Sequence, residues 1–161
     1  MKKQGFTLIE LMVVIVIMGI LAAVAVPKLF GMIAKSKASE VGPAAGTYIK
    51  LQDAYASEAN AIGGWKKIGY VAPGATKAGD TGNTTNFTYT GSVTADATVA
   101  IAGANQADAW KASNTVALNE CAIGAGNWTV TVADAGTGNS LSYTATTACD
   151  ELTPSFSKIG K

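Results

Sequence analysis

The stretch that decides the fold is residues 1–30, MKKQGFTLIELMVVIVIMGILAAVAVPKLF. From Phe6 to Val26 the run is apolar, and Glu10 is its only charged residue. As a helix, a run of this length measures about 30 Å, which matches the hydrocarbon core of a bilayer. The sequence therefore predicts an N-terminal helix that is long and apolar enough to cross a membrane.

Glu10 is the residue of this run that needs an explanation. A charged side chain in a membrane-spanning helix costs about 2.5–3.5 kcal/mol on insertion scales and usually marks a function. A secretory signal peptide cleaved after Ala25, or a simple membrane anchor, would account for the basic start at Lys2 and Lys3. Neither explains Glu10, and neither explains the helical pattern that resumes beyond Pro27.

A third interpretation comes from the residues around Glu10. The sequence KKQG before Phe6, followed by FTLIE and an unbroken apolar stretch, resembles the leader and cleavage site of class III prepilins. These are the precursors of type IV pilins, and the likeness is to a type IVa-like major pilin. The resemblance covers roughly residues 1–35. Gly19 and Pro27 also stand where many members of this family have a helix-loosening glycine and proline.

The resemblance implies a processing step. The leader, residues 1–5, would be removed by a cut between Gly5 and Phe6, and the new amine of Phe6 would be methylated. The apolar helix 6–27 would then stay in the mature protein and pack with its copies in the core of a filament. Glu10 lies about one helical turn after Phe6. Because an unpaired buried ion is costly, the Phe6 amine of a neighbouring subunit is its expected partner. The alternative is that Glu10 pairs within its own chain.

The segment 28–62 is predicted to be an amphipathic continuation of the helix. Apolar and aromatic residues recur there at helical spacings, namely Val41, Ala44, Ala45, Tyr48, Leu51, Tyr55 and Ile62. We expect Gly42-Pro43 to bend or loosen the helix, and Gly63-Gly64 to end it. A helix over 6–60 would measure about 80 Å. The rest of the chain cannot bury such a helix, so lipid or other subunits must bury its first half.

Residues 63–161 are expected to form a globular head, with a loop followed by an antiparallel sheet of about four strands. Short runs rich in Thr, Val and aromatic residues indicate strands at Phe87–Thr90, Thr98–Ile101, Thr115–Leu118, Trp128–Val132 and Leu141–Thr144. We expect Trp65, Tyr70 and Val71 to pin the loop to the head. The predicted fold class is α+β, with the sheet packed on the amphipathic half of the helix.

The two cysteines, Cys121 and Cys149, lie at similar distances on either side of a predicted hairpin loop around Gly136. A bridge between them is geometrically plausible, and an exported protein favours a disulfide over free thiols. The pilin resemblance agrees, because many type IVa pilins carry a C-terminal disulfide. Two unpaired buried thiols remain the alternative.

Composition argues against several functions. The 12 basic residues are all lysines, they balance 11 acids, and there is no histidine. Without a basic cluster we expect no specific nucleic-acid site. Without histidine, a Ser-His-Asp or Cys-His catalytic set cannot form, and the commonest metal ligand is missing. We therefore expect no enzymatic activity, no cofactor and no metal site.

The resemblance implies a structural subunit that polymerises with itself through its N-terminal helix into a type IV pilus, used for surface attachment or motility. Its precursor would cross the bacterial inner membrane once and meet the prepilin peptidase and the assembly machinery, and the product would be an extracellular pilus. One alternative is a pseudopilin of a type II secretion system, a class that often lacks a disulfide and uses calcium. Another is a secreted carbohydrate-binding module with an ordinary signal peptide and exposed tryptophans at Trp65, Trp110 and Trp128.

Overall fold

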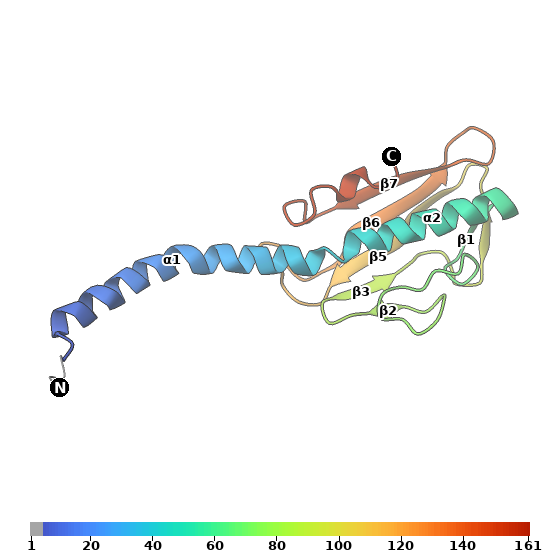
Figure 1. Cartoon of the computed structure of the whole chain (residues 1–161). Helices are drawn as coiled ribbons and strands as arrows, with labels where there is room; N and C mark the ends of the chain where they lie inside the picture. Colours follow the sequence, from blue (N-terminus) through green and yellow to red (C-terminus); the bar gives the residue numbers. More distant parts are fainter. Residues whose placement is uncertain (1–4) are drawn as a thin grey trace.

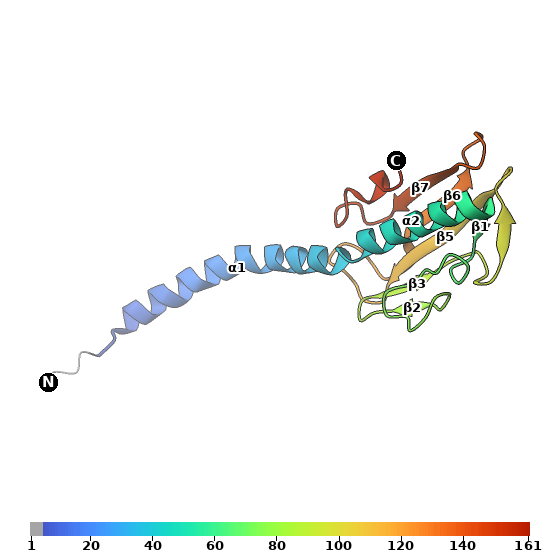
Figure 2. The same cartoon turned by 45° about the vertical axis from the view of Figure 1, so that its right-hand side comes forward.

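The computed structural model describes residues 5–161; the expected leader lies, apart from Gly5, outside the described residues. Two helices, α1 (Leu8–Ala38) and α2 (Val41–Ala59), follow one another at the start of the chain (Figure 1). The first half of α1 protrudes into solvent, and α2 lies along one face of the head (Figures 1 and 2). The architecture is the predicted α+β arrangement of a long N-terminal helical segment on an antiparallel sheet.

The helical segment is divided in two by a turn at Ser39 and Glu40, where we had expected one helix loosened at Gly42-Pro43. Proline has no N–H, so Pro43 cannot donate to the carbonyl of Ser39 four residues earlier, and the helical hydrogen-bond ladder is interrupted there. By contrast, α1 runs through Gly19 and Pro27 without a break.

The end of α2 also differs from the expectation. The helix ends at Ala59, and Asn60 adopts a left-handed conformation with φ 50° as its C-cap. Asparagine tolerates this conformation better than most residues, and its N–H closes the last turn on the carbonyl of Ala56. Gly63, which we expected to stop the helix, belongs instead to the short strand β1 (Ala61–Gly63).

The head contains a five-stranded antiparallel sheet in the order β2-β3-β5-β6-β7. Its strands are β2 (Gly82–Asn83), β3 (Phe87–Thr90), β5 (Asn105–Asn114), β6 (Gly124–Asp134) and β7 (Leu141–Thr147). A separate pair joins β1 to β4 (Thr98–Ala100), and a short 3-10 helix, η1 (Phe156–Lys158), follows β7. The residues described thus form more strands than the four expected.

One predicted strand is wrong and a longer one was missed. Residues Thr115–Leu118 form a bend and an isolated bridge, and the strand in this region is β5, which ends at Asn114. The pairing of β5 with β6 shifts between Gln106 and Trp110, and Asp108 within this shift has φ 52°. This bulge places two neighbours, Ala109 and Trp110, both in the core, which breaks the alternating pattern by which a strand is recognised.

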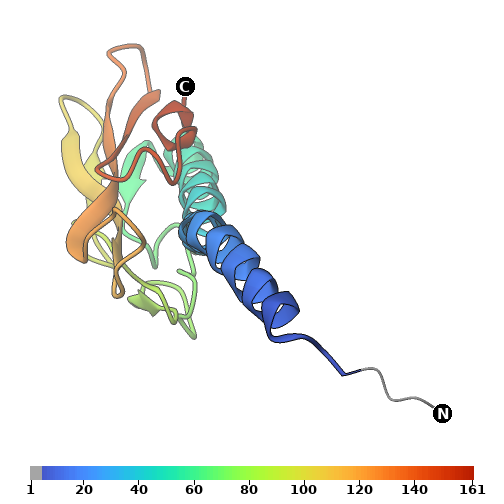
Figure 3. The ribbon, with the colours of Figure 1, turned by 90° about the vertical axis from the view of Figure 1, so that its left-hand side faces the viewer.

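The core lies between α2 and the sheet. Its largest buried side chains are aromatic: Tyr48, Tyr70, Phe87, Tyr89, Trp110, Trp128 and Phe156. Trp65 and Tyr70 are buried as predicted, and they stack edge to face with centroids 4.9 Å apart. Val71, the third expected anchor, is half exposed. Viewed along the helix, the head lies to one side of α2 and leaves the first part of α1 uncovered (Figure 3).

Candidate assembly site

Glu10 caps the helix on which it lies. The carboxylate oxygen Oε2 accepts a hydrogen bond from the Thr7 backbone N–H at 2.9 Å and from the Thr7 hydroxyl at 2.6 Å. The Glu10 N–H in turn donates to the Thr7 hydroxyl at 3.3 Å. This reciprocal capping box satisfies two backbone donors that the first turn of a helix leaves without partners. In the single chain Glu10 is therefore hydrogen-bonded to Thr7, but its charge has no cationic partner among residues 5–161.

The capping box uses one carboxylate oxygen and leaves the other available. Both Thr7 hydrogen bonds end on Oε2, and Oε1 receives none from residues 5–161. Glu10 is exposed, and Phe6, Ile9 and Val13 line a shallow surface groove beside it. The carboxylate can thus cap its helix and accept a second, external donor at once.

Packing against the described residues does not require glycine at position 5. A Cβ built at Gly5 would meet no atom of residues 5–161 within 4 Å.

The apolar surface of α1 is largely uncovered as far as Ile33, whereas Ala34 and Ala38 near its end are buried. Phe6 is 81% exposed and Leu8 83% exposed, and large apolar side chains remain uncovered as far as Ile33. In the part of the chain that the structure describes, one helical segment, Leu8–Ala59, is long and apolar enough by composition to cross a membrane. Its most apolar window has a mean hydropathy of 2.9, and none of that window is buried.

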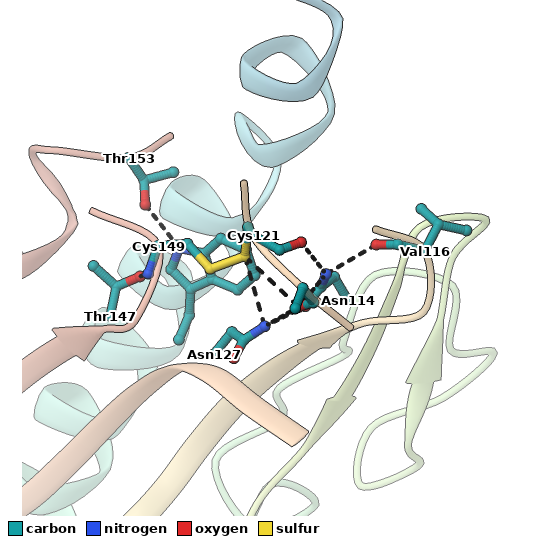
Figure 4. The surroundings of a disulfide bond; sticks show 9 residues. Asn114, Val116, Cys121, Asn127, Thr147, Cys149 and Thr153 are labelled. Atoms are coloured by element: carbon teal, nitrogen blue, oxygen red, sulfur yellow. Dashed lines mark hydrogen bonds between the residues drawn. A yellow bond between two sulfur atoms is a disulfide. The ribbon is translucent and has the colours of Figure 1, made fainter. Parts of the chain in front are cut away.

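The structure joins Cys121 and Cys149 in a disulfide, with Cα atoms 5.6 Å apart, so the predicted bridge is confirmed (Figure 4). Two amides that the sequence reasoning missed organise the loop beside it. The Asn114 amide donates to the carbonyls of Val116 and Ala122, and the Asn127 amide donates to Asn114 and to Ala122. Asn114 is 2% exposed, so its amide replaces the backbone partners that this irregular loop lacks.

The tryptophans do not form an exposed sugar-binding surface. Trp65, Trp110 and Trp128 are 4%, 0% and 0% exposed. Their ring N–H groups donate to partners inside the head, for example Trp110 to the Tyr70 hydroxyl at 2.8 Å. The expectation attached to the carbohydrate-binding alternative is therefore wrong for these three residues.

The polar loop around Asp134 serves the fold. The two carboxylate oxygens of Asp134 accept hydrogen bonds from the backbone N–H groups of Gly103 and Gly136. These hydrogen bonds lower the pKa of Asp134. Over residues 5–161, no group of three or more His, Cys, Asp or Glu side chains lies close enough together to hold a metal ion.

Comparison with known proteins gives one family model, the prokaryotic N-terminal methylation motif, which matches residues 1–26. The type IV major pilin protein PilA of Myxococcus xanthus is 42% identical over 38% of this chain and 31% of its own length. The type IV major fimbrial protein FimA of Dichelobacter nodosus is 56% identical over 24% of this chain and 25% of its own. No solved structure matches the chain.

The chain spans about a third or less of the length of these curated relatives. Another, the fimbrial protein EcpC of Eikenella corrodens, is 54% identical over 27% of this chain and 29% of its own length. These relatives are named as pilins and fimbrial proteins.

Proposed function

We propose that this chain, a type IV pilin by its methylation motif and its relatives, is the repeating subunit of a surface pilus used for attachment or motility. The observation that carries the proposal is the protruding half of α1, which exposes apolar side chains from Phe6 to Ile33. Such a surface must be covered, first by the bacterial inner membrane and then by the same helix of other copies. The disulfide of the head favours a pilus over a secretion pseudopilus.

The first step of the proposal is removal of the leader 1–5 by a prepilin peptidase, followed by methylation of the Phe6 amine. Because a Cβ at Gly5 would meet no atom of residues 5–161, Gly5→Leu should leave the fold intact and block cleavage. Gly31→Ala, at another uncrowded glycine, should be cleaved normally. Edman sequencing of the cleaved protein should begin at Phe6, and a start at Val26 would instead show an ordinary signal peptidase.

The second step is an ion pair between subunits. Cleavage converts the amide of Phe6 into a cationic amine, and Oε1 of Glu10 on a neighbouring copy has room to accept it while Oε2 keeps the Thr7 cap. In an apolar filament core the unpaired carboxylate would be strongly disfavoured, so only the register that supplies an amine is tolerated. The offset of four residues corresponds to about 6 Å along the helix.

Two substitutions separate the ion pair from the cap. Glu10→Gln removes the charge but keeps an oxygen that can accept from Thr7, whereas Thr7→Val removes the hydroxyl and keeps the charge. If the ion pair drives assembly, Glu10→Gln, like Glu10→Ala, gives cleaved protein without sheared surface filaments, and Thr7→Val still assembles. Normal filaments from Glu10→Gln would contradict the pairing and leave Glu10 only its capping role.

The helix-loosening role of Gly19 and Pro27 is also part of the proposal. Proline leaves a carbonyl of the preceding turn without its donor, so the segment between them is the part of α1 most easily extended in a filament. Gly19→Ala with Pro27→Ala should make the filament core more helical, which electron microscopy of sheared filaments would show. An equally helical core in both proteins would contradict this role.

A further inference from the structure

The corner where α1 leaves the head contains an apolar groove, which we call the base groove. Val26, Phe30 and Ile33 of α1 form one wall, and Ala117 and Leu118 lie on the other, around a volume of about 500 Å³. Lys37 of α1 also lines the groove and is its one charged lining residue among residues 5–161. The three α1 side chains are 45%, 60% and 43% exposed. Large apolar side chains exposed side by side in a concave surface are typical of a binding surface.

The base groove opens onto negative charge. Asn119 lines the groove and also a neighbouring pocket of about 250 Å³, which contains Glu120, Asp150 and Glu151. All three acids are exposed, and no ion pair formed within residues 5–161 includes any of them. An occupant that is apolar at one end and basic at the other would complement both parts of this surface.

The opposite face of α1 has that character. Lys28 and Lys35 are seven residues apart, which is about two helical turns, so they share a face. On an ideal helix, Lys28 lies about 160° around the axis from Phe30, well away from the wall of the groove. Leu21 and Val24 lie on the same face as Lys28 and are 63% and 73% exposed. Both lysines are exposed and take part in no ion pair of the described chain.

We propose that the base groove of one copy is the docking site for the lysine-bearing face of α1 from a second copy. Leu21 and Val24 of the second copy cover the apolar walls, and its lysines approach Glu120 and Asp150. Groove and docking face are different surfaces, so the contact is heterologous and repeats without closing, as an open helical polymer requires. This inference rests on the proposed function and names the contact that completes it at the head.

The ion-pair register proposed above is compatible with this contact. When the Phe6 amine of the second copy is level with Glu10 of the first, the second copy is shifted by four residues, about 6 Å, toward the head. Its Leu21 and Val24 are then level with residues 25 and 28 of the first copy, beside Val26 in the wall of the base groove.

Charge reversal tests the contact in full-length chains expressed with a pilus assembly system. Lys28→Glu with Lys35→Glu, and separately Glu120→Lys with Asp150→Lys, would each place like charges together. We expect at least about tenfold fewer sheared filaments from either double variant, because like-charge contacts cost several kcal/mol. A chain that carries all four substitutions restores the opposite charges and should assemble again.

The matched control reverses Lys67 and Lys77, two exposed lysines of the head outside the groove and the acidic pocket, and should keep wild-type filament yield. Cleavage after Gly5 confirms that each variant is processed. Resistance of Cys121 to a thiol-alkylating reagent, which indicates an intact disulfide, confirms that its head is folded. The docking proposal is overturned if the lysine variant assembles normally, or if the fourfold variant is no better than either double variant.

The same experiment separates this inference from the proposed function. If the wild-type chain assembles and Glu10→Gln abolishes assembly, while charge reversal has no effect, the docking contact fails and the pilus subunit stands. If the wild-type chain forms no filaments in a competent assembly system, the proposed function fails and the docking contact fails with it.

Discussion

Removing the disulfide should destabilise the head without changing its fold. The bridge closes a loop between residues 28 positions apart. For a loop of this length, the chain-entropy relation gives about 3.5 kcal/mol of stabilisation, through restriction of the unfolded chain. Cys121→Ala with Cys149→Ala should therefore lower the free energy of unfolding by about that amount. For a chain of this size, the melting temperature should fall by about 7–14 °C.

Tryptophan fluorescence is the suitable assay, with the full-length chain in detergent micelles. Trp65, Trp110 and Trp128 are the only tryptophans and all are buried in the head, so their emission reports unfolding of the head and not of α1. As a control, a thiol reductant should bring the wild type down to the melting temperature of the variant and leave the variant unchanged. A variant that melts within about 2 °C of the wild type would refute the loop-closure reasoning.

Three other outcomes follow from the head. The Tyr143 hydroxyl donates a 2.6 Å hydrogen bond to the exposed carboxylate of Asp53. Because solvent weakens a hydrogen bond to an exposed charge, a double-mutant cycle of Tyr143→Phe and Asp53→Asn should give a coupling energy of about 1 kcal/mol in urea unfolding. Burial raises the pKa of Tyr70 to about 12 and also raises that of Tyr143. The contribution of these two tyrosines to the free energy of unfolding is therefore fully present below about pH 10 and falls as pH rises from about 10 to 12. An unchanged melting temperature at about pH 11.5 would contradict this. Gly46→Ala, uncrowded in α2, should stabilise by up to about 1 kcal/mol, whereas Gly64→Ala, whose Cβ would lie 1.9 Å from a backbone oxygen, should destabilise; equal melting temperatures would exclude both effects.

The sequence predicted what depends on periodicity and composition. The apolar run after Gly5, the amphipathic face of the second helix and the hairpin of β6 and β7 all repeat a regular spacing. It did not predict β5, because a bulge at Asp108 breaks the alternation of that strand. The segment Thr115–Leu118 has the residues of a strand, but it lies in the loop that Asn114 and the disulfide hold, and tertiary contacts override β-propensity there.

The candidate assembly site also has a part that the sequence predicted and a part that it did not. Phe6 and Glu10 stand out because their residue types and spacing are unusual within an apolar helix. The Thr7 cap required atomic positions, since many threonines precede helices without forming a reciprocal pair. The base groove joins residues of α1 with a loop 80 or more positions away, and no local pattern links them.

The hydrogen bonds that join α2 and its N-cap residue Glu40 to the head have a mechanical consequence. Glu40 accepts from the Tyr89 hydroxyl at 2.7 Å, the Ala44 carbonyl from the Tyr70 hydroxyl at 3.2 Å, and Asp53 from the Tyr143 hydroxyl. These three attachments are spread over most of the length of the helix. In a fibre under tension, a pull on the helix would reach the head through all of them in parallel, so no single bond would carry the whole force. The head would then move with its helix as one rigid body and detach only when several attachments fail together.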